Sequence, residues 1–225
     1  MRIFLDAGHR NNVNDYGATG NGYKESSINL DIVKRLRERL LQYNVQIECN
    51  RYTEDETISL EQRVKKAKDF KADLYISIHC NSFSDPSSNG VEVLYNDDSM
   101  KALSKDLTDL LSKRTGFRNR KEKKRTDLYV LNHFKKAFLI ETGFISNPTE
   151  SKKIASTEYQ DKIIQAIIDI LITYGYINQA DNDYLKAINF LHDKKIISDK
   201  QLWIEQNFKS NHVRSLIIKM FNSFK

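Results

Sequence analysis

The chain has 225 residues, of which 40% are hydrophobic and 29% are charged, and its formal net charge is +6. This balance is typical of a globular protein with a sizeable core, and it excludes an intrinsically disordered chain. No apolar run reaches the ~18 residues of a transmembrane helix, and no apolar segment follows the charged start as in a secretory signal peptide. We therefore expect no membrane insertion and a product that stays where it is made until lysis or a partner releases it.

Apolar runs and helical repeats alternate along the first three quarters of the chain. In chain order, the predicted elements are a strand at 3–5, a helix at 28–41, a strand at 45–49, a helix at 59–70, strands at 74–78 and 91–95, a helix at 103–116, a short strand or turn at 128–131, a strand at 137–140 and a helix at 163–175. Ser59 followed by Gln62 has the capping-box pattern. Strands that alternate with helices of this length indicate an α/β fold, with a mostly parallel twisted sheet flanked by helices.

The pattern changes near residue 178. We assign 1–177 to the α/β domain and the polar segment 178–182 to a linker, because only helical repeats follow. Residues 183–225 predict a small all-helical module, in which Trp203 is either part of the core or an exposed ring that stacks on a sugar. A module of this size is marginally stable alone, so we expect it to pack on the first domain, to dimerise or to dock on a polymer.

Two histidines directly follow predicted strands. His9 comes after the first strand and the turn residue Gly8, for which a positive φ is expected, and His79 comes after the strand at 74–78. Open α/β sheets bind ligands beyond the C-terminal ends of their strands, so both imidazoles are expected at that edge. They are candidate ligands of a metal ion, although a single histidine is more often structural.

Two glutamates are placed to complete such a site. A hydrolytic zinc site needs three protein ligands, a position for water, and a further carboxylate that moves protons. Glu25 lies at the start of the first long helix, where the alternative is a residue that interacts with the helix dipole. Glu141 ends the strand at 137–140, where a buried charge is costly unless it pairs with a lysine. The coincidence of two histidines and two glutamates at equivalent ends of sheet elements favours a zinc hydrolase.

Short motifs accompany these four residues in a fixed order. They are Leu5-Asp6-Ala7-Gly8-His9, Gly17-Ala18-Thr19-Gly20, Glu25 with Asn29-Leu30, Asn50-Arg51 with Asp55, Ser59-Leu60 with Arg63, Ser77-Ile78-His79 with Asn81-Ser82, Gly90-Val91-Glu92, and Glu141-Thr142-Gly143-Phe144-Ile145-Ser146-Asn147. Over about residues 2–175 the chain resembles the zinc-dependent N-acetylmuramoyl-L-alanine amidases of the type 3 family, found in bacterial autolysins and phage endolysins. Each motif alone is weak, but the ordered set is specific.

The resemblance implies one zinc ion per chain, held by His9, Glu25 and His79, with Glu141 as the catalytic carboxylate. It implies hydrolysis of the amide bond between the lactyl group of N-acetylmuramic acid and the L-alanine of the stem peptide in peptidoglycan. Arg10 departs from the family, which commonly has glycine after the first histidine. Arg10 is therefore expected to alter substrate contacts near the metal.

Other polar residues of the motifs have two interpretations. Asn81 is expected either to hydrogen-bond the substrate or to hold the loop after His79. Arg51 and Arg63 are expected to be ion-paired structural residues rather than substrate contacts. Asp6 is expected to brace the turn at the first histidine, as a partner of an imidazole.

The two cysteines, Cys49 and Cys80, are expected to be small buried thiols without a disulfide. Cys80 adjoins His79, which makes it a conceivable ligand. Because consecutive strand residues point to opposite faces, Cys80 is expected to face away from whatever His79 serves.

A basic run, Arg118–Arg125, is interrupted only by Asn119 and Glu122. We expect a solvated loop that attracts anionic wall polymers in general, together with the helical module. The run lacks interleaved aromatic residues for base stacking, so specific nucleic-acid binding is not expected.

The function expected from these features is that of a peptidoglycan amidase. An inactive wall-binding or phage structural protein with the same fold is the alternative. Without an export signal, the protein is expected to be made in the bacterial cytoplasm and to act on the wall after release by a holin or by cell lysis, as in a phage endolysin.

Overall fold

The architecture is that of a computed structural model, which describes residues 1–10, 15–198 and 211–224, without the side chains of 180–182 and 211–214. Trp203 therefore lies outside the described residues. Six strands form the central sheet in the order β4-β1-β5-β8-β6-β7. The strands are β1 (Arg2–Ala7), β4 (Gln46–Cys49), β5 (Leu74–Asn81), β6 (Val91–Tyr95), β7 (Asn119–Lys124) and β8 (Ala137–Phe144).

Strand directions confirm the mostly parallel sheet. β4, β1, β5 and β8 run parallel to one another, whereas β6 is antiparallel to β8 and β7 is parallel to β6. A separate two-stranded hairpin, β2 (Thr19–Gly20) with β3 (Tyr23–Lys24), leads into the first helix.

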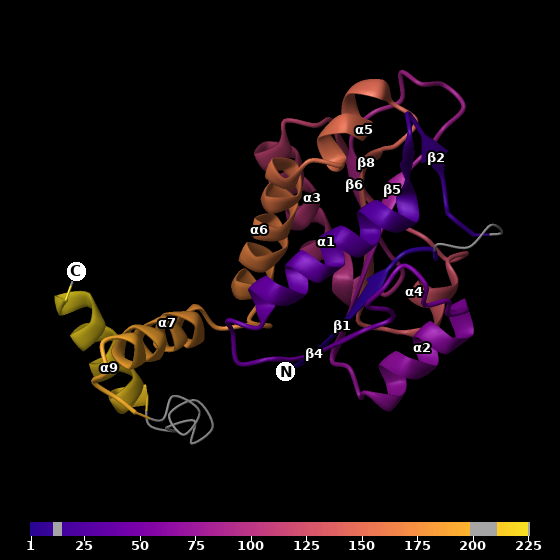
Figure 1. The fold of residues 1–225 in the computed structure, drawn as a ribbon. Coiled ribbons are helices and arrows are strands. Elements are labelled where there is room, and N and C mark those ends of the chain that lie inside the picture. The colour runs from indigo at the N-terminus through magenta and orange to yellow at the C-terminus, as the bar shows by residue number, and fades with distance from the viewer. Residues whose placement is uncertain (11–14, 199–210, 225) are drawn as a thin grey trace.

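Helices cover both faces of the sheet unequally (Figure 1). The helices of the first domain are α1 (Glu25–Leu40), α2 (Leu60–Asp69), α3 (Lys101–Thr115), α4 (Tyr129–His133), α5 (Pro148–Ile154) and α6 (Thr157–Thr173), with a 3₁₀ turn at Asp98–Met100. The long helices α1, α3 and α6 bury the large core on one face. The shorter α2 and α4 cover a smaller cluster on the other face, around Phe4, Tyr75 and Leu139.

Side-chain alternation explains the two cores. In β1, Ile3 and Leu5 belong to the large core, whereas Phe4 between them belongs to the small one. Because successive strand residues point to opposite faces, each inner strand contributes to both cores. The capping box at Ser59 and Gln62 and the left-handed C-cap Gly116 are present as predicted.

The helices at the C-terminal end pack mainly on each other. α7 (Gln179–Asp193) and α9 (Asn211–Ser223) share a small cluster around Ile188 and Ile217. Figure 1 shows this pair beyond the end of α6, away from the sheet. Within the described part of the chain, no helix has the length and apolar character needed to cross a membrane.

Several segments differ from the sequence-based expectation. The predicted linker 178–182 lies almost wholly in the helix α7, which begins at Gln179. The segment 128–131 enters the helix α4, in which the neighbours Val130 and Leu131 are both buried. Strand β8 continues to Phe144, so Glu141 lies inside the strand rather than at its end. Helix α5, with Asn147 as N-cap and Pro148 in its first turn, was not predicted, although this pair is a known helix-start signal.

The basic run forms the edge strand β7 instead of a solvated loop. Several of its side chains pair with acids of this chain. Arg120 and Lys123 pair with Glu92 of the neighbouring β6, and Lys124 pairs with Asp98. Charged side chains are common on edge strands, where they oppose pairing with another chain.

Candidate metal centre

His9 lies just beyond β1, in a turn that differs from the expected one. His9 itself has the positive φ of 59°, whereas Gly8 does not lie in that region. Gly8 is needed for a different reason, because a Cβ there would lie 2.4 Å from the imidazole of His79. The Arg63 side chain donates to the carbonyl oxygen of His9 (2.9 Å), which helps to hold the unusual backbone.

Glu25, the first residue of α1, lies between the two imidazoles. Its Oε1 is 3.0 Å from Nδ1 of His79 and 3.4 Å from Nε2 of His9. The three ligand atoms lie within 4.8 Å of one another. Ligand atoms in a tetrahedral zinc site with bonds of ~2.0–2.1 Å lie about 3.3 Å apart, so this donor set fits a zinc ion.

The carboxylate of Glu25 is held in place by backbone groups. Its Oε2 accepts a hydrogen bond from the Ala18 N–H (2.8 Å), and its Oε1 accepts one from the Cys80 N–H (3.0 Å). Gly17 packs so closely that a Cβ would lie 2.5 Å from Oε2. The glycine-rich loop before α1 is thus fitted around this carboxylate.

The three groups strongly affect one another's protonation. Burial acts to raise the pKa of Glu25, but hydrogen bonds and charge from His79 and His9 outweigh it and hold that pKa well below its usual range. Burial acts to lower the pKa of His9, but Glu25 and Asp15 outweigh it and raise that pKa to about 9. The cluster therefore keeps the Glu25 carboxylate ionised between two imidazoles, so that an anionic oxygen ligand is ready for a cation.

Asp15 is a site residue that the sequence did not reveal. Its Oδ1 lies 2.7 Å from Nδ1 of His9, which leaves Nε2 of that ring for a ligand. A carboxylate partner of this kind fixes the orientation of a metal-binding imidazole. The expected partner, Asp6, instead accepts hydrogen bonds from Arg63 (3.2 Å) and the Ser77 hydroxyl (2.8 Å).

Several motif residues brace the turn between β1 and His9. Arg51 and Asn29 donate to the Gly8 carbonyl oxygen (3.4 and 3.2 Å), and Asn50 exchanges two hydrogen bonds with the backbone of Ala7 (2.9 Å each). Arg63 is ion-paired with Asp6, whereas Arg51 donates to carbonyl oxygens. These contacts give the motifs a structural role close to the site.

Glu141 lies beside this group in the sheet. In the strand register it pairs with His79 of β5 on one side and with Glu92 of β6 on the other. Its Oε2 is shielded from solvent and has no hydrogen-bond partner among the described residues. Burial raises the pKa of Glu141 to about 7, with a contribution from the nearby carboxylates of Glu25 and Glu92. A carboxyl group with this pKa can exchange protons near neutral pH.

Asn81 and Arg10 are both engaged with the protein. Asn81 accepts a hydrogen bond from the Ser82 N–H (2.8 Å) and donates to Glu92 (3.1 Å), which favours its loop-holding interpretation. The Arg10 side chain pairs with Asp15 (3.1 Å), so it lies next to the partner of His9.

The cysteines are free and buried, as expected. Burial raises the pKa of the Cys80 thiol well above its ordinary value. The sulfur lies 3.5 Å from Oδ1 of Asn29, and it is not among the atoms of the metal-ligand group.

A cavity of about 330 Å³ opens directly beside the candidate metal centre. His9, His79 and Glu141 line it, and the remaining wall comes mainly from α4, β6, β8 and the start of α2. The other lining residues are Asp6, Leu60, Arg63, Leu94, Arg125, Leu128, Tyr129, Val130 and Leu139. This cavity is the natural place for a substrate of the centre.

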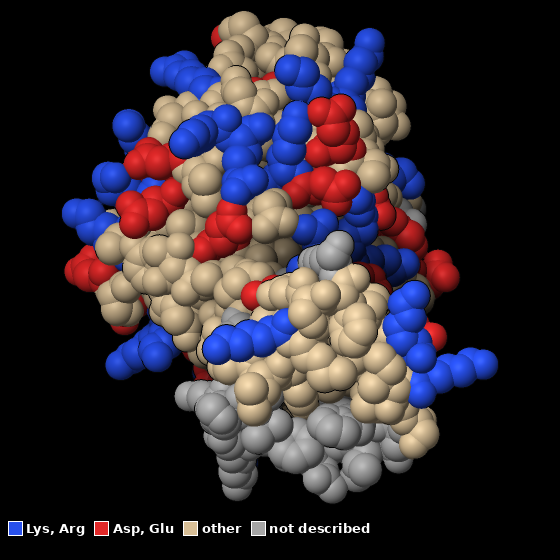
Figure 2. Space-filling view, turned by 90° about the vertical axis from the view of Figure 1, so that its left-hand side faces the viewer, with Lys and Arg blue, Asp and Glu red and all other residues tan. Residues whose placement is uncertain are grey.

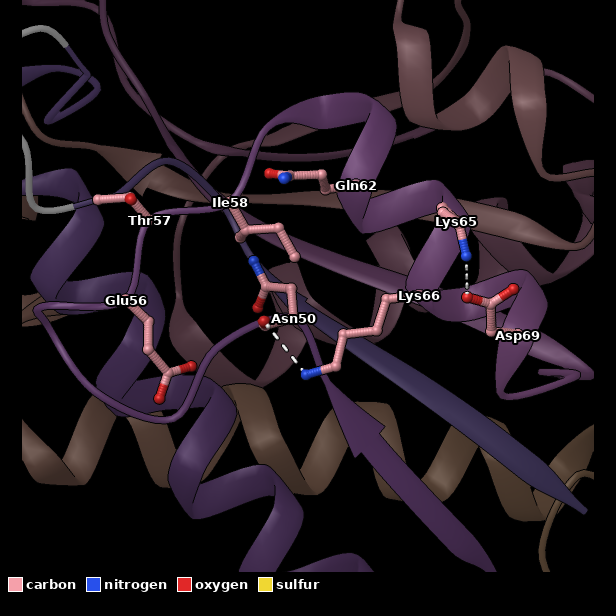
Figure 3. Close-up of a pocket in the computed structure, with 8 residues that line it drawn as sticks. All are labelled: Asn50, Glu56, Thr57, Ile58, Gln62, Lys65, Lys66 and Asp69. Atoms are coloured by element: carbon pink, nitrogen blue, oxygen red, sulfur yellow. Dashed lines mark hydrogen bonds and ion pairs between the residues drawn. The ribbon is translucent and has the colours of Figure 1, made fainter.

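A second cavity, of about 400 Å³, lies elsewhere (Figure 3). It is formed by α2 and the segment that precedes it, and it contains none of the candidate ligands. Lys66 at this cavity is 2.7 Å from the Cys49 carbonyl oxygen and 3.1 Å from Glu48, so it serves the local structure.

Comparisons with known proteins agree with this geometry. The family model described as N-acetylmuramoyl-L-alanine amidase matches residues 3–173. The N-acetylmuramoyl-L-alanine amidase LytC of Bacillus subtilis (strain 168) is 37% identical over 177 residues, which cover 76% of this chain but only 35% of LytC. The match thus spans about a third of LytC, and the match to the family model ends before α7 and α9.

Solved structures show the same fold. The catalytic domain of CwlV, an N-acetylmuramoyl-L-alanine amidase from Bacillus (Paenibacillus) polymyxa var. colistinus, has a TM-score of 0.73 at 28% identity, over 79% of this chain and 99% of that one. The CwlD amidase of Clostridioides difficile, in complex with the GerS lipoprotein, has a TM-score of 0.69 at 30% identity, over 77% of this chain and 97% of that one.

Proposed function

This chain belongs to the N-acetylmuramoyl-L-alanine amidase family, and we propose that it hydrolyses the amide bond between N-acetylmuramic acid and the L-alanine of the stem peptide in peptidoglycan. The observation that carries the proposal is the convergence of His9, Glu25 and His79 on one point beside the shielded carboxyl of Glu141. Three ligands and a separate proton carrier are what amide hydrolysis by zinc-activated water requires.

Zinc is the proposed cofactor, one ion per chain. Two imidazoles and one carboxylate suit zinc, a borderline-soft ion, better than they suit magnesium, which prefers oxygen ligands. When bound, zinc polarises the scissile carbonyl and lowers the pKa of water. His9, Glu25 and His79 would hold it, and Asp15 would orient the imidazole of His9.

Glu141 is the proposed proton carrier. Its carboxylate takes a proton from the attacking water as the new C–O bond forms at the scissile carbonyl. It then delivers that proton to the amide nitrogen as the C–N bond breaks, so that the peptide leaves as an amine. The pKa of about 7 suits both steps, because the group accepts and donates with similar ease near neutral pH.

The direct test is digestion of purified bacterial walls. We expect a loss of turbidity, new amino groups with alanine at the new N-terminus, and no new reducing sugar. Chelation should abolish the reaction and added zinc should restore it. New reducing ends would show a glycosidase instead, and intact walls that retain the bound, zinc-loaded protein would support an inactive wall-binding protein.

For partners beyond peptidoglycan, we propose two surfaces. The first is α7 with α9, where Leu216, Met220 and Phe224 are exposed at a helical spacing and favour wall binding or a homodimer. Figure 2 shows a largely uncharged area where these helices lie, below a face on which acidic and basic side chains are mixed. The second is the basic strand β7, which would attract anionic polymers. This attraction is weaker than the sequence of β7 alone suggests, because several of its cations pair with carboxylates of this chain.

For the place of action, we propose the cell wall, reached from the bacterial cytoplasm through a holin pore or after lysis. The proposed substrate supports this, because peptidoglycan lies outside the membrane. A phage endolysin is the setting we favour over a sporulation autolysin. Lysis of the producing cell only when a holin is co-expressed is the expected result.

A further inference from the structure

The cavity beside the metal centre has a defined direction. It begins at Glu141 and continues to Leu139, two residues earlier in β8, which pairs with Leu94 of β6. A strand rises ~3.3 Å per residue, so Leu139 lies about 7 Å from Glu141. Arg125 also lines the cavity, and its backbone N–H donates to the carbonyl oxygen of Tyr95, next to Leu94. The lining of the cavity thus combines an acid–base group, several apolar side chains and an arginine.

The walls of the cavity distinguish between the two halves of the substrate. Leu94, Leu139, Leu128 and Val130 offer apolar side chains, and a sugar hydroxyl that lies against them finds no hydrogen-bond partner there. An alanyl methyl group needs no hydrogen bond and gains from burial against such residues. The leaving amine must also lie at Glu141, where the cavity begins. Both arguments place the peptide, and not the glycan, in this cavity.

The guanidinium of Arg125 is oriented for a further contact. Asp127 accepts from Nε (2.7 Å) and from Nη2 (2.6 Å), which fixes the plane of the group. A guanidinium has five N–H donors, so Nη1 and one N–H of Nη2 remain for a ligand. A carboxylate is the group that such paired donors bind best.

Distance identifies which carboxylate this is. In peptidoglycan the second stem residue is a D-glutamate joined through its side-chain carboxyl, so that its α-carboxyl group is either free or amidated. An extended chain spans ~3.3–3.6 Å per residue, which places that α-carboxyl about 6–7 Å from the scissile nitrogen. This is comparable to the separation of about 7 Å between Glu141 and Leu139 along β8, in a cavity whose lining also includes Arg125.

We propose that the cavity binds the first two residues of the stem peptide and that Arg125 selects a free α-carboxylate on the second residue. The proposal rests on the proposed amidase function. A carboxamide at this position turns one acceptor oxygen into an NH₂ donor that faces the donors of Arg125, and it removes the opposite charge. Arg125 is therefore a specificity-determining residue rather than a participant in bond cleavage.

The test compares two soluble muropeptides that differ only at this group, one with a free α-carboxyl and one with a carboxamide. The zinc-loaded protein should cleave the free acid with a kcat/KM about tenfold higher, mainly through KM. Arg125→Gln should lower kcat/KM for the free acid far more than for the amide, so that the preference between the two is lost. Arg125→Lys keeps the charge without the fork, and it should retain part of the preference.

Lys124→Gln is the matched control. Lys124 adjoins Arg125 but pairs with Asp98 and does not line the cavity. Its variant should keep the full tenfold preference, although it loses the same charge. If Arg125→Gln fails to fold, the preference of Arg125→Lys decides, because an unchanged preference there contradicts selection by the guanidinium fork.

The outcomes separate the inference from the function on which it rests. Cleavage of both muropeptides at equal rates by the unaltered protein, or an equal loss for both in Arg125→Gln, overturns the selectivity alone. No cleavage of either muropeptide or of walls by the zinc-loaded protein overturns the amidase function, and the inference with it.

Discussion

The two faces of the central sheet are made from the same strands but serve different purposes. Toward α1, α3 and α6, residues of β5 such as Ile76 are fully buried in the large apolar core. Toward α2 and α4, the alternate residues change along the same strand from Tyr75 through Ser77 to His79. One face therefore supplies stability along its whole length, and the other supplies chemistry at one end.

The same change occurs in the neighbouring strands on the face toward α2 and α4. In β1 the buried Phe4 is followed two residues later by Asp6, and in β8 Leu139 is followed by Glu141. Because these strands are parallel to β5, their polar ends meet at one edge of the sheet. The short helices on this face leave the cavity open beside them, whereas the long helices seal the opposite face.

Glu141→Gln tests whether polar residues on the sheet face toward α2 and α4 support catalysis and lower the stability of the fold. We expect a loss of about 1,000-fold in kcat, because general acid–base catalysis contributes ~10²–10⁴-fold. Zinc content should stay the same, since Glu141 is not one of the proposed ligands. Wall digestion and metal analysis measure both, and a variant that keeps its turnover removes Glu141 from the proposed role.

Glu141→Gln should lower activity, but it should raise the free energy of unfolding at high pH. Burial raises the pKa of Glu141 to about 7, so the folded, metal-free protein favours its neutral form. Between the unfolded pKa of ~4.5 and pH 7 the unfolded state binds fewer protons, and stability falls as the pH rises. At pH 8 Glu141→Gln should therefore raise the free energy of unfolding, with a smaller effect below pH 4. Denaturant unfolding at the two pH values shows whether this sign is correct.

Ile76→Ala tests the opposite face. The side chain is fully buried in the large core, and its truncation should lower the free energy of unfolding by about 2–5 kcal/mol. At a temperature where the variant is folded, kcat and zinc affinity should change little, since Ile76 points away from His79. Ile76→Val is the graded control at ~0.5–1.5 kcal/mol. A large loss of kcat in the folded variant would show that the two faces are not independent.

Gly8→Ala alters the site through one methyl group. A Cβ at Gly8 would lie 2.4 Å from the His79 imidazole, which must move away from Glu25. We expect zinc affinity to fall about 10- to 100-fold, as for loss of a residue that supports a metal ligand. Gly175→Ala is the matched control, because a Cβ at Gly175 meets no atom within 4 Å. Its positive φ of 72° costs stability but should leave zinc affinity intact.

Much of this arrangement could be predicted from local patterns. His9 and His79 follow apolar strands, and β-strand alternation placed Cys80 on the opposite side from His79. Parallel strands then required the two imidazoles to share one edge. Glu25 and Glu141 could be grouped with the histidines at the same edge, but their separate roles as metal ligand and catalytic carboxylate came only from the resemblance, since many glutamates start helices or end strands.

The rest depends on contacts that no local pattern encodes. Asp15 contacts His9, whereas Asp6, which is nearer to His9 in the sequence, was the more obvious partner. The basic run became β7 because Glu92 of the neighbouring strand pairs with Arg120. The close approach of Gly8 to His79 joins two segments about 70 residues apart, so it could not be distinguished in the sequence from a turn that needs positive φ.

The smallest expected effect concerns protons released when zinc binds. In the metal-free protein Glu25 and Asp15 outweigh burial and raise the pKa of His9 to about 9, so His9 is protonated at pH 7. Zinc needs the free Nε2, so its uptake should release about one proton from His9. Zinc affinity should accordingly increase with pH and level off above about pH 9. Calorimetric titrations at pH 8 in two buffers of different ionisation enthalpy measure the number of protons.

Asp15→Asn separates the effects of Glu25 and Asp15, which together raise the pKa of His9. The variant keeps Glu25 but loses the carboxylate at Nδ1, so the pKa of His9 should fall and fewer protons should be released at pH 8. His133→Gln is the control, because that exposed imidazole bonds to the Tyr129 carbonyl oxygen and lies outside the ligand group. Equal proton release from the unaltered protein and from Asp15→Asn would show that Asp15 does not govern the protonation of His9. Of the two carboxylates, Glu25 alone would then raise the pKa of His9.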